Sequence, residues 1–459
     1  MKFLCLFSLI LSTALHAAPN LVIIYCDDLG WGDLGCFGNP TIQTPHLDQM
    51  AAQGQKWTQF YVAAPVCTPS RAGLMTGRYP IRNGMTSAKR VVFFPDSGSG
   101  LLPEEVTIAE MLKEQGYATG MFGKWHLGHL PQFQPTNQGF DTYYGIPYSN
   151  DMDRISGPNY RKEATDPSFL TKTEHYNVPL IHDGKEIARP ADQHTITKAY
   201  TEKTIAFIEA NKDNPFFVYL PHSMPHIPLF ASENFVGRSK RGLYGDVIEE
   251  IDWSVGQVLS TLRRLKLAEN TMVMFCSDNG PWLTFKTHGG SAGPLRAGKG
   301  TTFEGGQRVP TIFWWPGTIP AASVVTDIGS ATDMMATLAT ICGGKAPSDR
   351  TLDSLDLTPA LKGTGESPRD DFFYWTRAEL HAVRSGPWKL HLKQREPINY
   401  GRAVILPKPQ LFHLEHDISE AYDVASSHPE IVAKLLAMAD AHKAQIAPYP
   451  DQLIIRIPK

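Results

Sequence analysis

Continuous apolar runs alternate with amphipathic segments over the first three quarters of this chain. The apolar runs have the length of strands, and their lack of alternation is typical of parallel strands covered on both faces. We expect strands at residues 21–26, 118–123, 216–220, 272–276 and, with one proline, 309–315. Helical periodicity lies between them, at 104–115, 197–211, 246–267 and 333–341. This alternation predicts an α/β fold with a large mixed, mostly parallel sheet flanked by helices.

The pattern changes after about residue 345. Short strand patterns at 372–375, 382–384, 388–392 and 411–414 precede a helical pattern at 429–446. They predict a smaller antiparallel sheet with one packing helix. We therefore divide the mature chain into an α/β domain, residues 19–345, and a C-terminal α+β subdomain, residues 346–459. Residues 145–195 are polar and weakly periodic, and we expect loops there, near a pocket.

Residues 1–18 have the pattern of a secretory signal peptide. Lys2 precedes an apolar run over residues 3–15, which is followed by His16 and two alanines. The alternative is a buried N-terminal strand. The run is too short to span a membrane, and no later segment is long enough. The chain has no Asn-x-Ser/Thr glycosylation site, which is unexpected for a secreted animal enzyme, so we expect an exported bacterial protein, periplasmic or secreted.

Composition excludes several classes of protein. A hydrophobic content of 42% supports a packed core, and a net charge of −3 predicts neither a nucleic-acid nor an anionic-membrane partner. An anionic substrate would have to meet local positive charge. Cys26 and Cys276 lie in predicted strands, where a buried free thiol is usual, and no cysteine pattern resembles a disulfide framework or a zinc site. The sequence leaves the oligomeric state open.

Polar residues follow four of the predicted strands directly. In chain order they are Asp27 and Asp28, Lys124 and His126, His222 and His226, and Asp278 and Asn279. Ligands of open α/β sheets bind outside the carboxyl ends of the strands. Four clusters at such ends predict one active site at this edge of the sheet.

Two of these clusters supply oxygen ligands. Asp27, Asp28, Asp278 and Asn279 offer carboxylate and amide oxygens from two strand ends, which fits Ca²⁺ or Mg²⁺ better than zinc. Each pair alone could be a helix cap or a turn. Because both pairs follow strands, we favour the metal site.

Cys67 precedes a predicted helix at residues 69–75, whose first turn suits Pro69. A nucleophile at a helix N-terminus faces unpaired backbone N–H groups, which favour an anion. These features alone leave an activated cysteine and a buried thiol equally open. Ser70 is the second candidate nucleophile, although we expect its hydroxyl to bond the backbone.

Several motifs resemble those of the type I, formylglycine-dependent sulfatases. The most specific are Cys67-x-Pro-x-Arg71 within residues 67–78, and residues 123–128, 278–280 and 298–306. The resemblance is to the arylsulfatase A and N-acetylgalactosamine-6-sulfatase branch of the alkaline phosphatase superfamily, through residues 145–149 and 131–133. It continues through residues 363–369 and 373–375, and so covers nearly the whole mature chain.

This resemblance implies the chemistry of the site. Cys67 would be converted to formylglycine by a separate maturation enzyme, and a hydroxyl of the aldehyde hydrate would attack sulfur. One divalent cation, Ca²⁺ in the first place and Mg²⁺ otherwise, would be held by Asp27, Asp28, Cys67, Asp278 and Asn279. Arg71 and Lys124 would orient the hydrate, and His126 would take the proton whose removal releases sulfate. Lys299 and a histidine would bind the sulfate, and one of them would protonate the leaving oxygen.

The resemblance also selects the histidine and the substrate class. The His-x-Pro spacing favours His226 over His222, which we expect to line the pocket or fix a loop. We expect a sulfuric ester hydrolase acting on a sulfated carbohydrate, a glycosaminoglycan or algal polysaccharide fragment. The alternative is a phosphodiesterase or phosphonate monoester hydrolase of the same superfamily, but the ligands of a second metal are missing. A non-catalytic binding protein would be expected to have lost one of Cys67, Arg71, Lys124, His126 and Lys299. Residues 150–192, where specificity would lie, match nothing.

Overall fold

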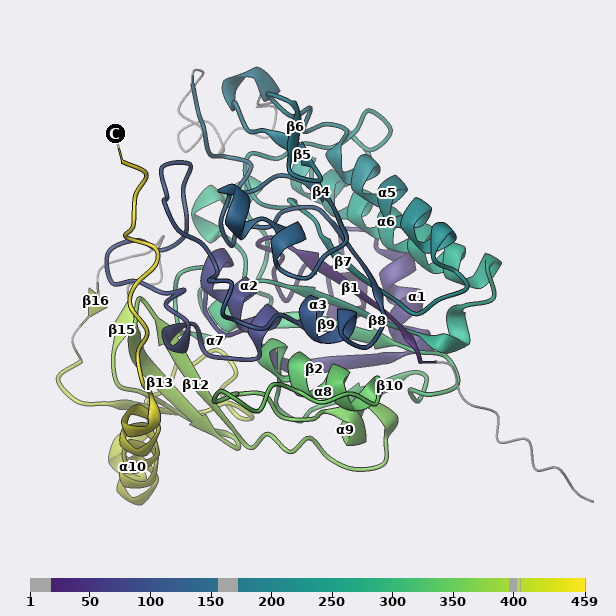
Figure 1. Cartoon of the computed structure of the whole chain (residues 1–459). Coiled ribbons are helices and arrows are strands. Elements are labelled where there is room, and N and C mark those ends of the chain that lie inside the picture. Colours follow the sequence, from purple (N-terminus) through teal and green to yellow (C-terminus); the bar gives the residue numbers. More distant parts are fainter. Residues whose placement is uncertain (1–17, 156–171, 396–402, 405, 459) are drawn as a thin grey trace, which may run out of the picture.

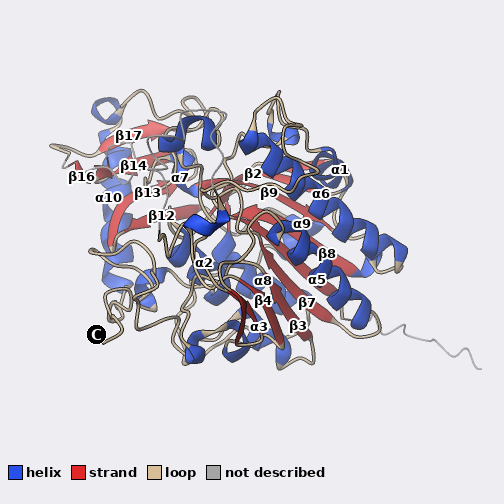
Figure 2. Ribbon diagram, turned by 90° about the horizontal axis from the view of Figure 1, so that it is seen from above, coloured by secondary structure: helices blue, strands red, loops and turns tan. Residues whose placement is uncertain are grey.

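An eleven-stranded sheet forms the body of the protein (Figures 1 and 2). The computed structural model describes residues 18–155, 172–395, 403–404 and 406–458. The strands are β1 Asn20–Cys26, β2 Gln55–Tyr61, β3 Ala118–Phe122, β4 Thr142–Gly145, β5 Leu180–His182, β6 Lys185–Ala188, β7 Phe216–Pro221, β8 Thr271–Ser277, β9 Arg308–Trp314, β10 Ser323–Val325 and β11 Gly329–Ser330. Ten of them run in the order β10-β2-β9-β8-β1-β7-β3-β4-β5-β6, and β11 pairs with β2. Only β9 and β5 run against their neighbours, which confirms the predicted mixed, mostly parallel sheet.

Helices cover both faces of this sheet. They are α1 Pro45–Gln53, α2 Cys67–Thr76, α3 Ile108–Lys113, α5 Ile196–Ala210, α6 Leu243–Arg264, α7 Glu304–Gln307, α8 Met334–Ile341 and α9 Thr358–Lys362. Helices α1, α5 and α6 lie on one face and α2, α3 and α8 on the other (Figure 1). Alternate residues of β1 enter the two cores: Val22 and Ile24 pack in the first, Leu21 and Ile23 in the second. Burial on both faces explains why β1 is apolar from Leu21 to Cys26.

Three predictions of local structure need correction. The loops expected over 145–195 include the hairpin β5–β6, which extends the edge of the main sheet. Strand β2 was not predicted, because its polar residues interrupt the apolar run by which the other strands were recognised. The helix expected at 104–115 is shorter, since Thr107 and Glu110 form a capping box that starts α3 at Ile108.

The C-terminal region forms the predicted smaller sheet. Strands β12 Asp371–Thr376, β13 Glu379–Ser385, β14 Trp388–His391 and β17 Gln410–His413 pair antiparallel in that order. Helix α10, Pro429–Gln445, packs on one face through Leu435 and Ala439 and lies at the outside of the molecule (Figure 1). A separate antiparallel pair, β15 Gln394–Arg395 and β16 Ala403–Val404, lies beside the four-stranded sheet (Figure 1). The other face meets the main sheet, where Phe372 stacks on Tyr61 of β2.

The carboxyl ends of β1, β3, β7 and β8 lie at one edge of the main sheet, because these strands are parallel neighbours. The four polar clusters predicted from the sequence follow these ends. Cys26 and Cys276 are buried free thiols, as expected. Among the described residues, no helix combines the length and apolar character needed to cross a membrane. The proposed signal peptide falls almost wholly outside the described residues.

Candidate active site

Two pairs of side chains extend from the ends of β1 and β8. These strands pair in parallel up to their last residues, so the segments that follow lie side by side. The backbone N–H of Asp28 donates to Asp278 Oδ1 over 3.2 Å, and Asn279 Nδ2 donates to Asp28 Oδ1 over 2.7 Å. Asp28 has a φ of 67°, a left-handed conformation that costs a non-glycine residue energy and is common at functional sites. All four side chains, including that of Asp27, are buried.

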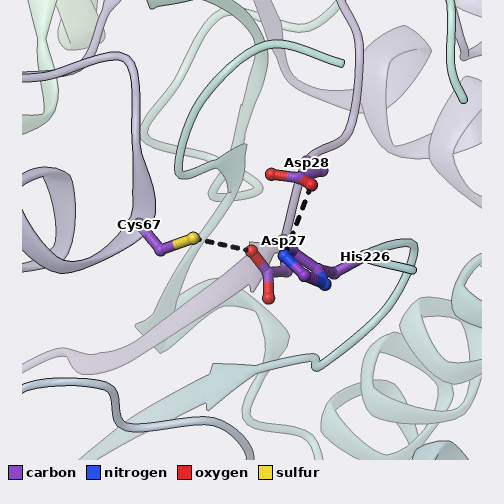
Figure 3. Close-up of side chains that lie close together, drawn as sticks. All are labelled: Asp27, Asp28, Cys67 and His226. Atoms are coloured by element: carbon purple, nitrogen blue, oxygen red, sulfur yellow. Dashed lines mark hydrogen bonds and ion pairs between the residues drawn. The ribbon is translucent and has the colours of Figure 1, made fainter. Parts of the chain in front are cut away.

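Cys67 is the first residue of α2, two positions earlier than the predicted helix start. Its Sγ lies 3.5 Å from Asp27 Oδ1 (Figure 3). Ligand atoms of Asp27, Asp28, Cys67 and His226 all lie within 4.8 Å of one another. The structure therefore brings these four predicted residues together in one buried cluster. Burial, together with the charge of Asp27, raises the pKa of the Cys67 thiol, so an unmodified Cys67 would stay protonated.

Arg71 and Lys124 balance the carboxylates from the side of α2 and β3. Arg71 Nε donates to Asp278 Oδ2 over 3.0 Å, and its Nη2 lies 3.8 Å from Asp27 Oδ1. The Lys124 ammonium forms an ion pair with Asp27. Burial disfavours a charged Asp27, but the neighbouring cations, Lys124 foremost, hold its pKa well below the usual range. Burial and the charge of Asp27 raise the pKa of Asp278.

Lys299 closes the opposite side of the cluster. Its Nζ lies 2.8 Å from Asp28 Oδ1 and 4.1 Å from the ring centroid of Trp282, a cation–π contact. The ring of His226 lies 5.4 Å from the same indole. Trp282 thus packs against both predicted sulfate-binding residues. It was not predicted, although it follows the Asp-Asn-Gly-Pro run after β8.

His226 is fixed by its neighbours in one ring orientation. Nδ1 lies 2.6 Å from the carbonyl oxygen of Ile227 and 3.2 Å from Asn150 Oδ1. These acceptors place the proton of the neutral ring on Nδ1, so Nε2 faces Asp28 Oδ2 at 3.7 Å without one. Burial, and then the charge of Lys299, lower the pKa of His226. Asn150 was not singled out in the sequence, because its partner is 76 positions away.

His126 lies in the same buried layer but beside Lys124. It has a φ of 62°, and its Nε2 lies 3.0 Å from the carbonyl oxygen of Phe93. Its Nδ1 lies 3.5 Å from Ser149 Oγ, which accepts a 2.6 Å hydrogen bond from Lys124 Nζ. Burial and the charge of Lys124 lower the pKa of His126 well below its ordinary value, so the ring is neutral. Ser149 links the two predicted residues and is a further member of the site.

The cluster fits a hard divalent cation. Its oxygen donors come from Asp27, Asp28, Asp278 and Asn279, and Asn279 Oδ1 is buried without a hydrogen-bond partner among the described residues. An orphaned buried amide oxygen costs free energy unless it meets a donor or a cation. The three carboxylates face three cationic side chains, Arg71, Lys124 and Lys299. A divalent cation would therefore give the site a net positive charge, as an anionic substrate requires.

Two weaker candidates lie elsewhere. His222 is buried, its Nε2 lies 3.3 Å from Ser254 Oγ of α6, and burial lowers its pKa to about 3. It connects the end of β7 to α6, consistent with a loop-fixing role. The hydroxyl of Ser70 lies 3.5 Å from that of Tyr25, whereas the sequence predicted a backbone bond.

The smaller C-terminal sheet holds the segment that carries Lys299. Lys389 Nζ of β14 donates to the carbonyl oxygen of Thr302 over 2.8 Å and to Glu304 Oε1 over 2.9 Å. It also pairs with Glu420 at 2.9 Å, and the Glu304 N–H donates to Glu420 Oε2 over 2.7 Å. All three charged side chains are fully buried. Sequence patterns did not indicate this network.

Comparison with known proteins agrees with this geometry. The sulfatase family model matches residues 19–344, and the model of the C-terminal region of aryl-sulfatase matches residues 367–456. N-acetylgalactosamine-6-sulfatase of Canis lupus familiaris is 38% identical over 95% of this chain and 88% of its own length. Arylsulfatase A of Homo sapiens is 39% identical over 94% and 89%.

Solved structures give the same result. The PsFucS1 sulfatase from Pseudoalteromonas sp. superposes with a TM-score of 0.82 at 28% identity, covering 93% of this chain and 90% of that one. Ps i-CgsB, solved in complex with k-i-k-neocarrahexaose, gives a TM-score of 0.78 at 32% identity, covering 96% and 95%. From the matched family models, relatives and fold, we conclude that the chain belongs to the sulfatase family and is a sulfuric ester hydrolase.

Proposed function

We propose that this sulfatase removes sulfate from a sulfated carbohydrate, with Cys67 converted to formylglycine and one divalent cation bound beside it. The observation that carries the proposal is the buried cluster of Asp27, Asp28, Cys67 and His226 at the N-terminus of α2. The name of the N-acetylgalactosamine-6-sulfatases and the neocarrahexaose in the Ps i-CgsB complex support a sugar as the substrate. A glycosaminoglycan or algal polysaccharide fragment fits both.

The cation would be held by Asp27, Asp28, Asp278, Asn279 and residue 67. It would supply positive charge next to the sulfate oxygens, which stabilises the charge that develops there during transfer. We propose Ca²⁺ because the donors are oxygens of several kinds and Ca²⁺ accepts flexible, irregular oxygen coordination. Mg²⁺ is the alternative.

The protein's own residues would bind the ester and move protons. Lys299 would hold a sulfate oxygen, and Trp282 would limit water around its ammonium group. His226 would protonate the leaving oxygen from Nε2 in its doubly protonated form, because Nδ1 keeps its own proton on the acceptors of Ile227 and Asn150.

Residue 67 and its neighbours would carry the second half of the reaction. A hydroxyl of the hydrated aldehyde would attack sulfur, and Arg71 and Lys124 would orient that hydrate. The neutral ring of His126 would then accept the proton of the second hydroxyl, so that the aldehyde re-forms and sulfate leaves. Ser149, between His126 and Lys124, would position this base.

Export and maturation belong to the same proposal. Residues 1–18 would direct the chain to the periplasm or out of a bacterial cell, where extended sulfated polysaccharides are found. A separate maturation enzyme would oxidise Cys67. We also propose that the mature chain divides into an α/β domain, residues 19–345, and a C-terminal subdomain, residues 346–459.

The decisive experiment is the mass of the tryptic peptide from Trp57 to Arg71, taken from protein made in its native host. We expect an aldehyde at position 67 in place of the thiol. Sulfate release from aryl sulfates and sulfated sugars is measured on the same preparation. An unmodified thiol in fully active enzyme would contradict the formylglycine proposal.

Two substitutions separate the nucleophile from its surroundings. Cys67→Ala and Cys67→Ser should both abolish turnover, because neither alanine nor serine yields the aldehyde hydrate by this route. Both side chains fit the volume of a thiol, so the thermal midpoint should change little. Substantial sulfate release by the serine variant would show that a simple hydroxyl suffices.

A further inference from the structure

A hollow lies beside the N-terminus of α2, between that helix and the hairpin β12–β13. Its lining residues are Ala64, Val66, Pro69, Thr86, Ser87, Val91, Thr376 and Arg377. Val66 and Pro69 lie within two residues of Cys67 in the chain, so the hollow lies at the end of α2 that carries the candidate nucleophile. Among the residues that the structure describes, no carboxylate lines it. The polar part of the lining consists of one guanidinium group and three hydroxyl groups.

The turn of the hairpin has an unusual backbone. Thr376 pairs with Glu379, so the turn consists of Arg377 and Ala378, with φ values of 49° and 63°. Two-residue hairpin turns with two positive φ angles favour asparagine and glycine, and each other residue costs about 1–2 kcal/mol there. The Ala378 N–H donates to Thr86 Oγ1 over 3.2 Å, which holds the turn against the hollow. Strain maintained in this way is typical of binding and catalytic sites.

Arg377 brings a positive charge to the hollow. Its guanidinium is half-buried and forms no hydrogen bond or ion pair with any residue in the described part of the chain. Glu379, the nearest acid in the hairpin, is paired with Lys393 at 3.0 Å. Lys89, whose backbone N–H donates to Ser87 Oγ, adds positive charge to the same loop, whereas the charge of Arg90 is paired with Asp96 at 2.6 Å. Burial and the charge of Arg377 also lower the pKa of Arg395, so a second cation lies close by.

The hydroxyl groups are arranged to donate. Ser87 Oγ accepts two backbone N–H groups and Thr86 Oγ1 accepts one, so their oxygens are engaged as acceptors. Each hydroxyl keeps its own hydrogen for a ligand. Hydroxyl donors beside a cation, with no acid in the described part of the lining, favour an anionic group.

We propose that Arg377, with Thr86, Ser87 and Thr376, forms a subsite for a second anionic group of the substrate. This group is a sulfate or a carboxylate on the same saccharide as the ester that is cleaved. The inference rests on the proposed function and deepens it, because it selects polyanionic saccharides over neutral sugars that carry a single sulfate.

Binding is measured first, by calorimetry in the Cys67→Ala background, so that turnover is not needed. The probes are three disaccharides that share one sulfate ester and carry, on the other ring, a second sulfate, a carboxylate or no charge. Arg377→Gln should weaken binding of one or both dianionic probes on the order of 10-fold or more and the neutral-ring probe much less. The probe with the larger loss identifies the anionic group. Equal losses on all three probes, or none, would overturn the subsite.

Two control variants distinguish the loss of the Arg377 charge from a general effect of the substitution on folding. Arg377→Lys should restore part of the affinity, because it keeps the charge and loses the planar fork. Arg264→Gln removes an exposed arginine at the C-terminal end of α6, at the opposite edge of the sheet, and should change no affinity. With the unmutated enzyme, the Arg377→Gln loss should appear in KM for the dianionic probes, with kcat nearly unchanged. If the unmutated enzyme binds these probes but cleaves no sulfate ester, the proposed function fails and the subsite stands.

Discussion

Replacing Lys389 by methionine tests how the smaller C-terminal sheet stabilises the protein. The ammonium group is fully buried and contacts Glu304 and Glu420, each at 2.9 Å, and the Thr302 carbonyl oxygen at 2.8 Å. Methionine fills a similar volume but leaves two buried carboxylates without their shared cation. Removing one partner of a buried ion pair costs about 3–5 kcal/mol, because the remaining charge is uncompensated.

The surrounding groups place the expected loss within this range. Glu304 keeps Arg308 at 3.4 Å and Arg384 at 3.9 Å, and Glu420 keeps His391 at 2.7 Å. These contacts partly offset the missing cation, so we expect a loss near the lower end, about 3 kcal/mol.

The assay is urea unfolding, followed by tryptophan fluorescence and by circular dichroism to test for a single transition. Lys393→Met is the matched control. Lys393 pairs with Glu379 at a similar distance, 3.0 Å, but both side chains are nearly half exposed. An exposed pair contributes about 0–1 kcal/mol.

Equal losses for the Lys389 and Lys393 variants would refute the reasoning, because burial is the main difference between the two pairs. The double variant Lys389→Met/Glu304→Gln provides a second check. It should lose less than the sum of its single changes, since the amide leaves no unpaired charge at position 304.

Three further predictions concern acid stability and the active site. Burial opposes the charge of Glu304, but Lys389 and two arginines hold its pKa below the ordinary 4.5. The stabilisation is therefore complete above pH 4.5 and is lost on acidification, so the difference in unfolding free energy between wild type and Lys389→Met should shrink below that pH. Asp278→Ala should lose both bound metal, measured by elemental analysis, and activity. Chelation of the wild-type enzyme should have the same effect. Full activity without metal would contradict the ligand assignment. Asn150→Ala should lower kcat on the order of 10-fold with little change in the thermal midpoint, because it releases one contact of His226; unchanged kcat would remove Asn150 from the site.

The sequence predicted those residues of the site that directly follow a predicted strand. Asp27 and Asp28 follow an apolar strand, as do Asp278 and Asn279, and parallel strands bring their carboxyl ends to one edge. The structure places His226, and not His222, in the buried cluster. The roles of these residues stay predictions until the variants are measured.

Residues that act through distant partners were not visible in the sequence. Trp282 matters because it contacts both Lys299 and His226, and Asn150 because its side chain meets a ring 76 positions away. Strand β2 escaped prediction for a similar reason. Its polar residues fit a strand only because β9 and β10 lie on either side of it.

The sequence by itself determined the adjacent strands β9, β8, β1, β7 and β3 of the main sheet and the helices α3, α5, α6 and α8, because burial on both faces demands unbroken apolar runs and helices repeat every 3.6 residues. It also determined which residue types stand at the strand ends. Only the tertiary structure decided which charges share a partner. Lys389 and Glu420 meet Glu304 across 85 and 116 residues, and Arg377 reaches the hollow beside Cys67 through a hairpin more than 300 residues further along the chain. Such contacts depend on how the smaller sheet packs against the main sheet, and no local pattern encodes that packing.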